Sequence, residues 1–230
     1  MDRVKFAKKL AREFRKLGYD NHSDYIEILR ELRKEMPEIK NKKKSQKLAE
    51  FLTIDEVREF LSTAYNLRTK DFQKGLIGET FIKTGIRNAE LCNLRIENID
   101  FKTQIFKIIQ GKGKKDRLGI MPSSLLRTII IFLQGRKSGF LFLNNRGKPF
   151  STRSIQYIIS EIKTKSNINK DIHPHSLRHT FATILKESGV EIRDIQKLLG
   201  HSNIQTTTIY EHMVITDKKD EILKITEHIG

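Results

Sequence analysis

The chain has 230 residues, of which 44 are Lys or Arg and 28 are Asp or Glu, so its formal net charge is 44 − 28 = +16. Such an excess attracts polyanions over long distances, and nucleic acid is the first partner to consider. The single cysteine excludes an intramolecular disulfide framework and any multi-cysteine zinc site. Because no apolar run approaches ~18 residues and no signal-peptide pattern is present, we expect a cytoplasmic protein.

The first fifty residues predict a small basic helical arm followed by a linker. Apolar residues recur at helical spacing over residues 3 to 17 and again over 23 to 36, and Pro37 ends the second helix. Residues 38 to 47 are rich in lysine and lack periodicity, which is typical of a flexible tether. The sequence thus predicts three segments: an arm at 1 to 37, a linker at 38 to 50 and a larger domain at 51 to 230.

The larger domain is predicted to be mainly α-helical with a small antiparallel β-sheet, an α+β fold. Thr53 to Glu56 form a capping box that opens a helix, and Gly85 and Gly200 mark later helix ends. Further helices are predicted over 70 to 84, 88 to 94, 122 to 134, 151 to 165, 174 to 189, 192 to 199 and 216 to 227. Asn88 could cap the second of these. Strands are predicted over 99 to 101, 105 to 109 and 118 to 121. A separate short helix or extended turn is predicted over 206 to 211.

Two histidines, an arginine and a tyrosine near the C-terminus form the main candidate site. His175, Arg178, His201 and Tyr210 come within reach of one another if the helices between them fold back. A glycine-bearing turn at residues 110 to 117 carries further lysines, but it lacks the spacing of a phosphate-cradling nucleotide loop. The sharper interpretation of this turn is a mobile basic finger in a DNA groove, and the plainer one is an exposed charged turn.

These residue types suit chemistry on a phosphodiester. Arginine is permanently charged and binds two phosphate oxygens at once, and histidine, with a pKa near ~6.5, can move a proton at neutral pH. A lysine whose pKa is lowered can protonate a departing 5′ oxygen, and a tyrosine stabilised as phenolate can attack phosphorus. The covalent ester keeps the bond energy, so this chemistry requires neither metal nor nucleotide cofactor.

Each candidate also has a plainer structural interpretation. Tyr210 alone would be taken as a packed aromatic residue and His201 as a turn histidine. Arg87 follows the glycine corner at residue 85, where an arginine commonly satisfies helix C-terminal carbonyls, and by itself that interpretation is favoured. A structural core does not require all these residue types at these spacings, so the set taken together favours chemistry.

Five motifs resemble the tyrosine recombinases of the Xer and phage-integrase type, over about residues 50 to 215. They are Thr84-Gly85-Ile86-Arg87-Asn88-Ala89-Glu90-Leu91, Gly111-Lys112-Gly113-Lys114-Lys115-Asp116-Arg117, His175-Ser176-Leu177-Arg178-His179, Leu199-Gly200-His201 and Tyr210. The resemblance implies that Arg87 and Arg178 clamp the scissile phosphate and that Lys112 is the general acid. It also implies that His175 assists proton transfer from the nucleophile, His201 binds a non-bridging oxygen, and Tyr210 attacks to give a 3′-phosphotyrosine.

The resemblance further implies double-stranded DNA as partner and a homotetramer working on two recombination sites. Two alternatives stay open: a type IB topoisomerase-like cleavage and religation, and a DNA-binding accessory module whose catalytic residues are unused. The helix at 216 to 227 would dock on a neighbouring protomer, as in the family, or pack on its own chain. Residues His173 and His179 receive no catalytic role, and His179 is taken as a packing or hydrogen-bonding residue.

Family members usually carry a core-binding domain of four or more helices that encloses the duplex together with the catalytic domain. Only two helices are predicted here before residue 50. We therefore hypothesise that residues 3 to 36 form a reduced clamp arm.

A chain lacking residues 1 to 45 is expected to bind duplex DNA more weakly, because it loses basic side chains that contact backbone phosphates. The measurement is duplex affinity for both chains at several salt concentrations, where the shorter chain should also show the shallower salt dependence. Unchanged affinity would show that the arm is not a clamp.

Overall fold

The computed structural model describes residues 2–35, 50–109, 116–200 and 208–229. The chain divides into two compact units, Met1–Lys47 and Leu48–Gly230, and each is described by itself. The smaller unit contains α1 (Arg3–Lys16) and α2 (His22–Glu35). Asp2 caps α1 by accepting a hydrogen bond from the Val4 amide. The side chain of Asn21 caps α2 by accepting a hydrogen bond from the Asp24 amide at 3.0 Å.

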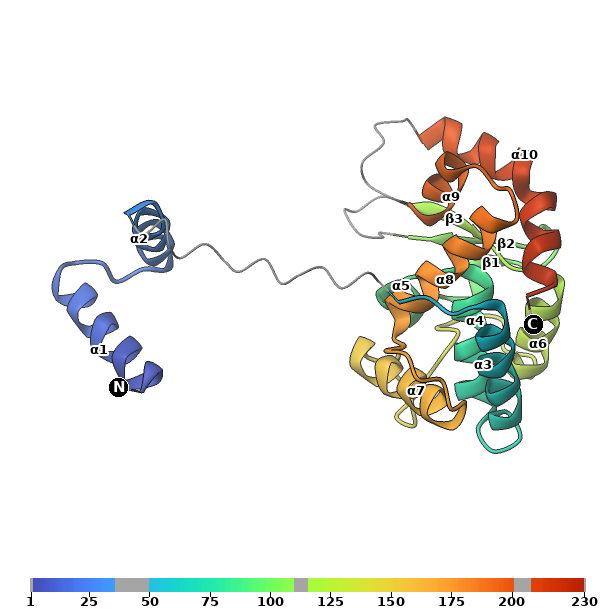
Figure 1. Ribbon diagram of the computed structural model, residues 1–230, viewed down its shortest axis with the longest axis horizontal. Helices are drawn as coiled ribbons and strands as arrows, with labels where there is room; N and C mark the ends of the chain where they lie inside the picture. The colour runs from blue at the N-terminus through green and yellow to red at the C-terminus, as the bar shows by residue number, and fades with distance from the viewer. Residues whose placement is uncertain (1, 36–49, 110–115, 201–207, 230) are drawn as a thin grey trace. The chain divides into compact units, whose positions relative to one another are not determined.

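The larger unit is mainly helical and contains one three-stranded antiparallel sheet, which confirms the predicted fold class (Figure 1). Its helices are α3 (Ile54–Leu67), α4 (Phe72–Thr84), α5 (Asn88–Cys92), α6 (Ser123–Leu133), α7 (Thr152–Lys165), α8 (Pro174–Glu187), α9 (Ile192–Leu199) and α10 (Thr208–Glu227). Its strands are β1 (Ile99–Asp100), β2 (Ile105–Ile108) and β3 (Arg117–Ile120). None of the helices in the described ranges is long and apolar enough to cross a membrane.

The centre of this unit is α4, which contacts α3, α6, α7, α8 and α10. Every residue from Gly75 to Thr84 is buried, as expected for a helix that is enclosed on all sides. A Cβ on Gly75 would lie 2.1 Å from the Ala64 carbonyl oxygen, so the glycine permits the close approach of α3. Charged side chains on α4 are paired: Lys83 lies 3.3 Å from Glu79, which also binds Arg68.

The three strands lie in sequence order, and β2 pairs with β3 through Phe106 opposite Gly119. A Cβ on Gly119 would lie 2.2 Å from the Phe106 ring, so this glycine makes room for a buried aromatic side chain. Residues 110–115 of the predicted basic finger between β2 and β3 lie outside the described residues, and its last two residues, Asp116 and Arg117, are described. Strand β3 contacts both α9 and α10, so the sheet lies beside the helix that ends at Gly200 and the helix that contains Tyr210.

Two predictions about local structure are wrong. Residues 208 to 227 form one continuous helix, α10, rather than a short turn and a separate last helix. Glycine and proline are absent from this stretch, so nothing in it interrupts the helix. Asn88 is not the cap of α5; the capping position is Arg87, whose amide donates to the Glu90 carboxylate at 2.9 Å.

The C-terminal end of α10 packs on its own chain. Ile222 and Leu223 are buried in a cluster with residues of α8 and α9, and Ile229 joins the main core. The Glu227 carboxylate accepts a hydrogen bond from the Ser124 amide at 3.1 Å, so it caps the first turn of α6. The buried apolar residues at this end of the chain therefore pack against other residues of the same chain.

Gly85 ends α4 in the left-handed conformation, with φ of 59°. A Cβ there would lie 2.4 Å from the buried ring of Phe181 and 3.0 Å from Leu199. Glycine is thus required both by the backbone conformation and by the packing of α8 and α9 against this corner.

Substituting Gly85→Ala is expected to lower the free energy of unfolding by roughly 2–5 kcal/mol, because it adds steric overlap to a left-handed backbone. The control is Gly147→Ala, which has φ of 68° but no atom within 4 Å of the added Cβ. That variant should lose only about 1–2 kcal/mol. Urea denaturation of both variants measures the difference, and equal losses would rule out the packing contribution.

Candidate active site

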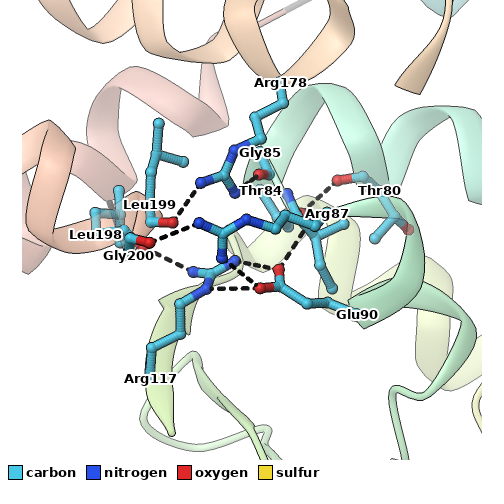
Figure 2. Close-up of polar contacts among 11 residues, drawn as sticks. Thr80, Thr84, Gly85, Arg87, Glu90, Arg117, Arg178, Leu198, Leu199 and Gly200 are labelled. Carbon is cyan, nitrogen blue, oxygen red and sulfur yellow. Dashed lines mark hydrogen bonds and ion pairs between the residues drawn. The ribbon is translucent and has the colours of Figure 1, made fainter. Parts of the chain in front are cut away.

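Three arginines and one glutamate, brought together from four segments, form the candidate site (Figure 2). Arg87 comes from the corner after α4, and Glu90 follows it on α5. Arg117 is the first residue of β3, and Arg178 lies on α8. All four side chains converge on the C-terminal end of α9, where the chain turns at Gly200.

Each arginine donates to one of three consecutive carbonyl groups at the end of α9. Arg117 Nη1 donates to Leu198 at 2.7 Å, and Arg87 Nη2 donates to Gly200 at 2.6 Å. Arg178 donates to the Leu199 carbonyl between them, and its other terminal nitrogen donates to Gly85 at 2.7 Å. Carbonyls in the last turn of a helix generally lack partners within it, and the helix dipole makes this end negative, so three cations stabilise it.

Glu90 holds two of the arginines. Its carboxylate accepts from Arg117 Nε at 3.2 Å and Nη2 at 2.5 Å, and from Arg87 Nη1 at 2.7 Å. Burial alone would raise the pKa of Glu90, but the hydrogen bonds and charges of Arg117 and Arg87 outweigh it. The pKa of this carboxyl therefore falls to about 2, and the group is ionised at neutral pH.

The site has an excess of two positive charges, because one carboxylate balances three guanidinium groups. Burial, together with the charges of Arg87 and Arg117, lowers the pKa of Arg178 to about 9. This repulsion favours a negatively charged ligand, whose binding would relieve it. The Arg87 side chain is 23% exposed, so the cluster is open to such a ligand from at least this side. Two guanidinium groups acting together suit the oxygens of a phosphate.

His175 lies in the first turn of α8, one helical turn before Arg178, and is exposed. Burial of part of the ring lowers its pKa, and the nearby charges of His173, Arg178 and His179 lower it further. The imidazole is therefore neutral at pH 7 and able to accept a proton. The ring of His173 stacks parallel to it, with the centroids 6.2 Å apart.

Two histidines without a predicted catalytic role have structural ones. His173 caps α8, because its Nδ1 accepts a hydrogen bond from the Ser176 amide at 3.2 Å. The ring of His179 meets the Phe51 ring edge-on at 5.7 Å, as its predicted packing role requires.

The structure gives no side-chain position for three of the predicted catalytic residues. Lys112 and His201 lie outside the described residues. Tyr210 is the third residue of α10, and the structure describes its backbone alone. The geometry therefore brings Arg87 and Arg178 together, with His175 on the same helix as Arg178. The catalytic roles of all six residues stay predictions.

Glu90 and Arg117 belong to the observed cluster, but the sequence analysis assigned neither of them to the site. A signal exists for Glu90, which follows Arg87 by three positions in a helix and therefore lies on the same face. Arg117 ends a lysine-rich run and looks there like one more exposed cation. In the described ranges, the structure contains no group of three or more His, Cys, Asp or Glu side chains that could hold a metal ion.

Comparisons with known proteins identify the family of this chain. The phage integrase family model matches residues 50–215. The chain is 36% identical over 236 residues to tyrosine recombinase XerA of Pyrococcus horikoshii, and the match covers 97% of this chain and 79% of that protein. It is 35% identical over 190 residues to a tyrosine recombinase of Thermosipho africanus, with 83% of this chain and 66% of that protein covered.

A crystal structure of XerA recombinase has the same fold, with a TM-score of 0.61, 27% sequence identity, and coverage of 96% of this chain and 83% of that one. The chain belongs to the phage integrase family of tyrosine recombinases. It spans slightly less than two-thirds of the length of the Thermosipho africanus relative.

Replacing Glu90 by Gln should remove a contribution to folding that depends on pH. The folded pKa of about 2 lies below the ordinary value of 4.5, so the stabilisation is complete above pH 4.5 and declines as pH falls toward 2. The difference in unfolding free energy between the original chain and Glu90→Gln should shrink by roughly 3 kcal/mol over that range. Denaturant titrations at several pH values measure it.

The control variant is Glu97→Gln, which removes an exposed carboxylate that pairs with Arg95. It should change the pH dependence little, because solvent screens that pair. A stability difference for Glu90→Gln that stays constant down to pH 2 would contradict the assigned ion pairs.

Proposed function

We propose that this protein is a site-specific DNA recombinase that cleaves and rejoins DNA strands through a covalent bond to Tyr210. The observation that carries the proposal is the cluster of Arg87 and Arg178 around a helix end, with two positive charges in excess. A phosphodiester in the transition state carries more negative charge on its non-bridging oxygens than in the ground state. Preorganised cations at that point stabilise the transition state more than the substrate.

The two proposed phosphate-binding arginines are held before substrate arrives. Arg178 is 5% exposed and donates to two backbone carbonyls, while Arg87 is bound to Glu90 and to the Gly200 carbonyl. Their orientation therefore costs little entropy when DNA binds. Arg87 is the more exposed of the pair, so it is the first to meet a phosphate.

The remaining steps need two proton transfers. The Tyr210 hydroxyl oxygen attacks phosphorus, and its proton passes toward His175, whose lowered pKa leaves the ring neutral and able to accept it. Lys112 donates a proton to the departing 5′ oxygen, and His201 donates a hydrogen bond to a non-bridging oxygen. Attack by a 5′ hydroxyl on the phosphotyrosine reverses these transfers. One phosphodiester replaces another, so the sequence of steps needs no energy source.

Double-stranded DNA is the proposed partner, supported by the net charge of +16 and by membership in the tyrosine recombinase family. We further propose a homotetramer acting on two recombination sites, because each exchange must break and rejoin four strands. The proposed location is the cytoplasm, where such a substrate is found in cells without a nucleus.

Incubation with a pool of nicked, random-sequence duplexes tests the covalent step. The nick lets a short cleaved fragment diffuse away, so the covalent intermediate accumulates. The original chain should give a protein–DNA adduct that survives denaturation, and Tyr210→Phe should give none, because it lacks the attacking oxygen. The measurement is denaturing gel electrophoresis of labelled DNA.

The matched control is Tyr157→Phe, which removes the hydroxyl of an exposed tyrosine on α7 and should leave the adduct intact. An adduct that persists in Tyr210→Phe would assign the nucleophile elsewhere. If the original chain shifts duplexes in a salt-dependent manner but yields no adduct, the protein is instead a DNA-binding accessory module.

A further inference from the structure

One arginine of the cluster has no part in the proposed mechanism. Arg117 is only 8% exposed, and each of its three guanidinium nitrogens already has a partner. Nε and Nη2 bind the two oxygens of Glu90, and Nη1 binds the Leu198 carbonyl. Nε and Nη2 of Arg117 thus already bind a carboxylate in the paired arrangement that a phosphate would need, whereas the hydrogen-bond partners of Arg178 are neutral carbonyls.

The Arg117 side chain packs closely against the backbone at Gly200. Gly200 adopts φ of 64°, and a Cβ there would lie 2.7 Å from Arg117 Cδ. The same Cβ would lie 3.6 Å from Arg87 Nη1. The turn at the end of α9 is therefore shaped around these two arginine side chains, which enter it from different segments of the chain.

The contacts of Arg117 lead directly to Arg87. Glu90 is shared between them, because its Oε1 accepts from both Arg117 Nε and Arg87 Nη1. Arg117 and Arg87 also bind carbonyls two residues apart on the same turn. Without Arg117, the Glu90 carboxylate would lose two of its hydrogen bonds. The Leu198 carbonyl would lose the hydrogen bond that it accepts from Arg117. Both would then be free to rearrange around Arg87.

We propose that Arg117 is a positioning residue, which fixes the Arg87 guanidinium for phosphate binding through Glu90 and through the end of α9. The proposal rests on the function proposed above. It assigns a task to a residue of β3 that contacts no substrate. Because Arg117 is also the first residue of that strand, the same contact fixes the sheet against the arginine cluster.

The test compares cleavage of a phosphodiester with cleavage of a methylphosphonate at the same position. Replacing one non-bridging oxygen by a methyl group removes the negative charge that Arg87 neutralises, so correct placement of Arg87 matters less. The duplex is one captured from the random pool by the original chain. On the phosphodiester, Arg117→Met should slow single-turnover cleavage by about 100-fold, the cost of a misplaced binding group.

On the methylphosphonate, the same variant should lose less than about fivefold relative to the original chain. Arg117→Lys keeps the positive charge but not the paired hydrogen bonds to Glu90. Its cleavage rate on the phosphodiester should lie between those of the original chain and Arg117→Met. Equal losses on both substrates would mean that Arg117 only supports the fold, and would overturn the proposal.

The matched control is Arg68→Met. Arg68 is also largely buried and bound to a glutamate, Glu79, but it lies between α3 and α4 and contacts none of the arginine cluster. This variant should lose stability while slowing cleavage of both substrates equally. A selective loss on the phosphodiester in this control would show that general destabilisation mimics the effect.

A second measurement does not depend on cleavage. In the NMR spectrum of the ¹⁵N-labelled chain, the side-chain N–H signals of Arg87 should shift and exchange faster with water in Arg117→Met. Backbone amide signals of α4 should stay unchanged, and inorganic phosphate should perturb the Arg87 signals less than in the original chain. Unaltered Arg87 signals would overturn the positioning role, whereas absence of any adduct with the original chain would overturn the proposed function alone.

Discussion

The negative end of α9 is the contact on which the site depends. Three consecutive carbonyl groups, of Leu198, Leu199 and Gly200, each accept a hydrogen bond from a different arginine. Those arginines come from positions 117, 178 and 87, far apart in the sequence. A helix end thus gathers like charges that would otherwise repel one another, and Glu90 reduces the repulsion without cancelling it. The remaining excess of positive charge favours the binding of an anion.

The rest of the fold holds this helix end in place. Helix α4 is enclosed by other helices and ends at Gly85, whose carbonyl is the second acceptor of Arg178. The same glycine leaves space for Phe181 and Leu199, so α8 and α9 approach the corner closely. Arg117, the first residue of strand β3, contacts the same helix end from the sheet. Core packing and site geometry therefore share the same residues, and a change at this corner affects both.

The charged groups buried in this unit are balanced in one place and incompletely balanced in another. Lys83 and Arg68, which are away from the site, are paired with Glu79 in the core. In the cluster, by contrast, one carboxylate serves three guanidinium groups, so the positive charge is incompletely balanced. An incompletely balanced buried cluster costs folding free energy, and such a cost is expected where a charged substrate completes the arrangement. Membership in the tyrosine recombinase family agrees with a phosphodiester as that substrate.

The sequence predicted the fold class, the three strands and most helices, because apolar periodicity and glycine at helix ends are local signals. It also predicted Arg87 and Arg178 as partners, through motifs that resemble one family. It did not predict that α10 is continuous, because a stretch without glycine or proline is compatible with one long helix or with two shorter ones. Nor did it identify Arg117 as part of the cluster, because a cation after a lysine-rich turn looks like a solvated one. The place of Arg117 in the cluster depends on long-range packing, which brings the start of β3 to Glu90 of α5 and to the end of α9, where the side chain is buried and paired.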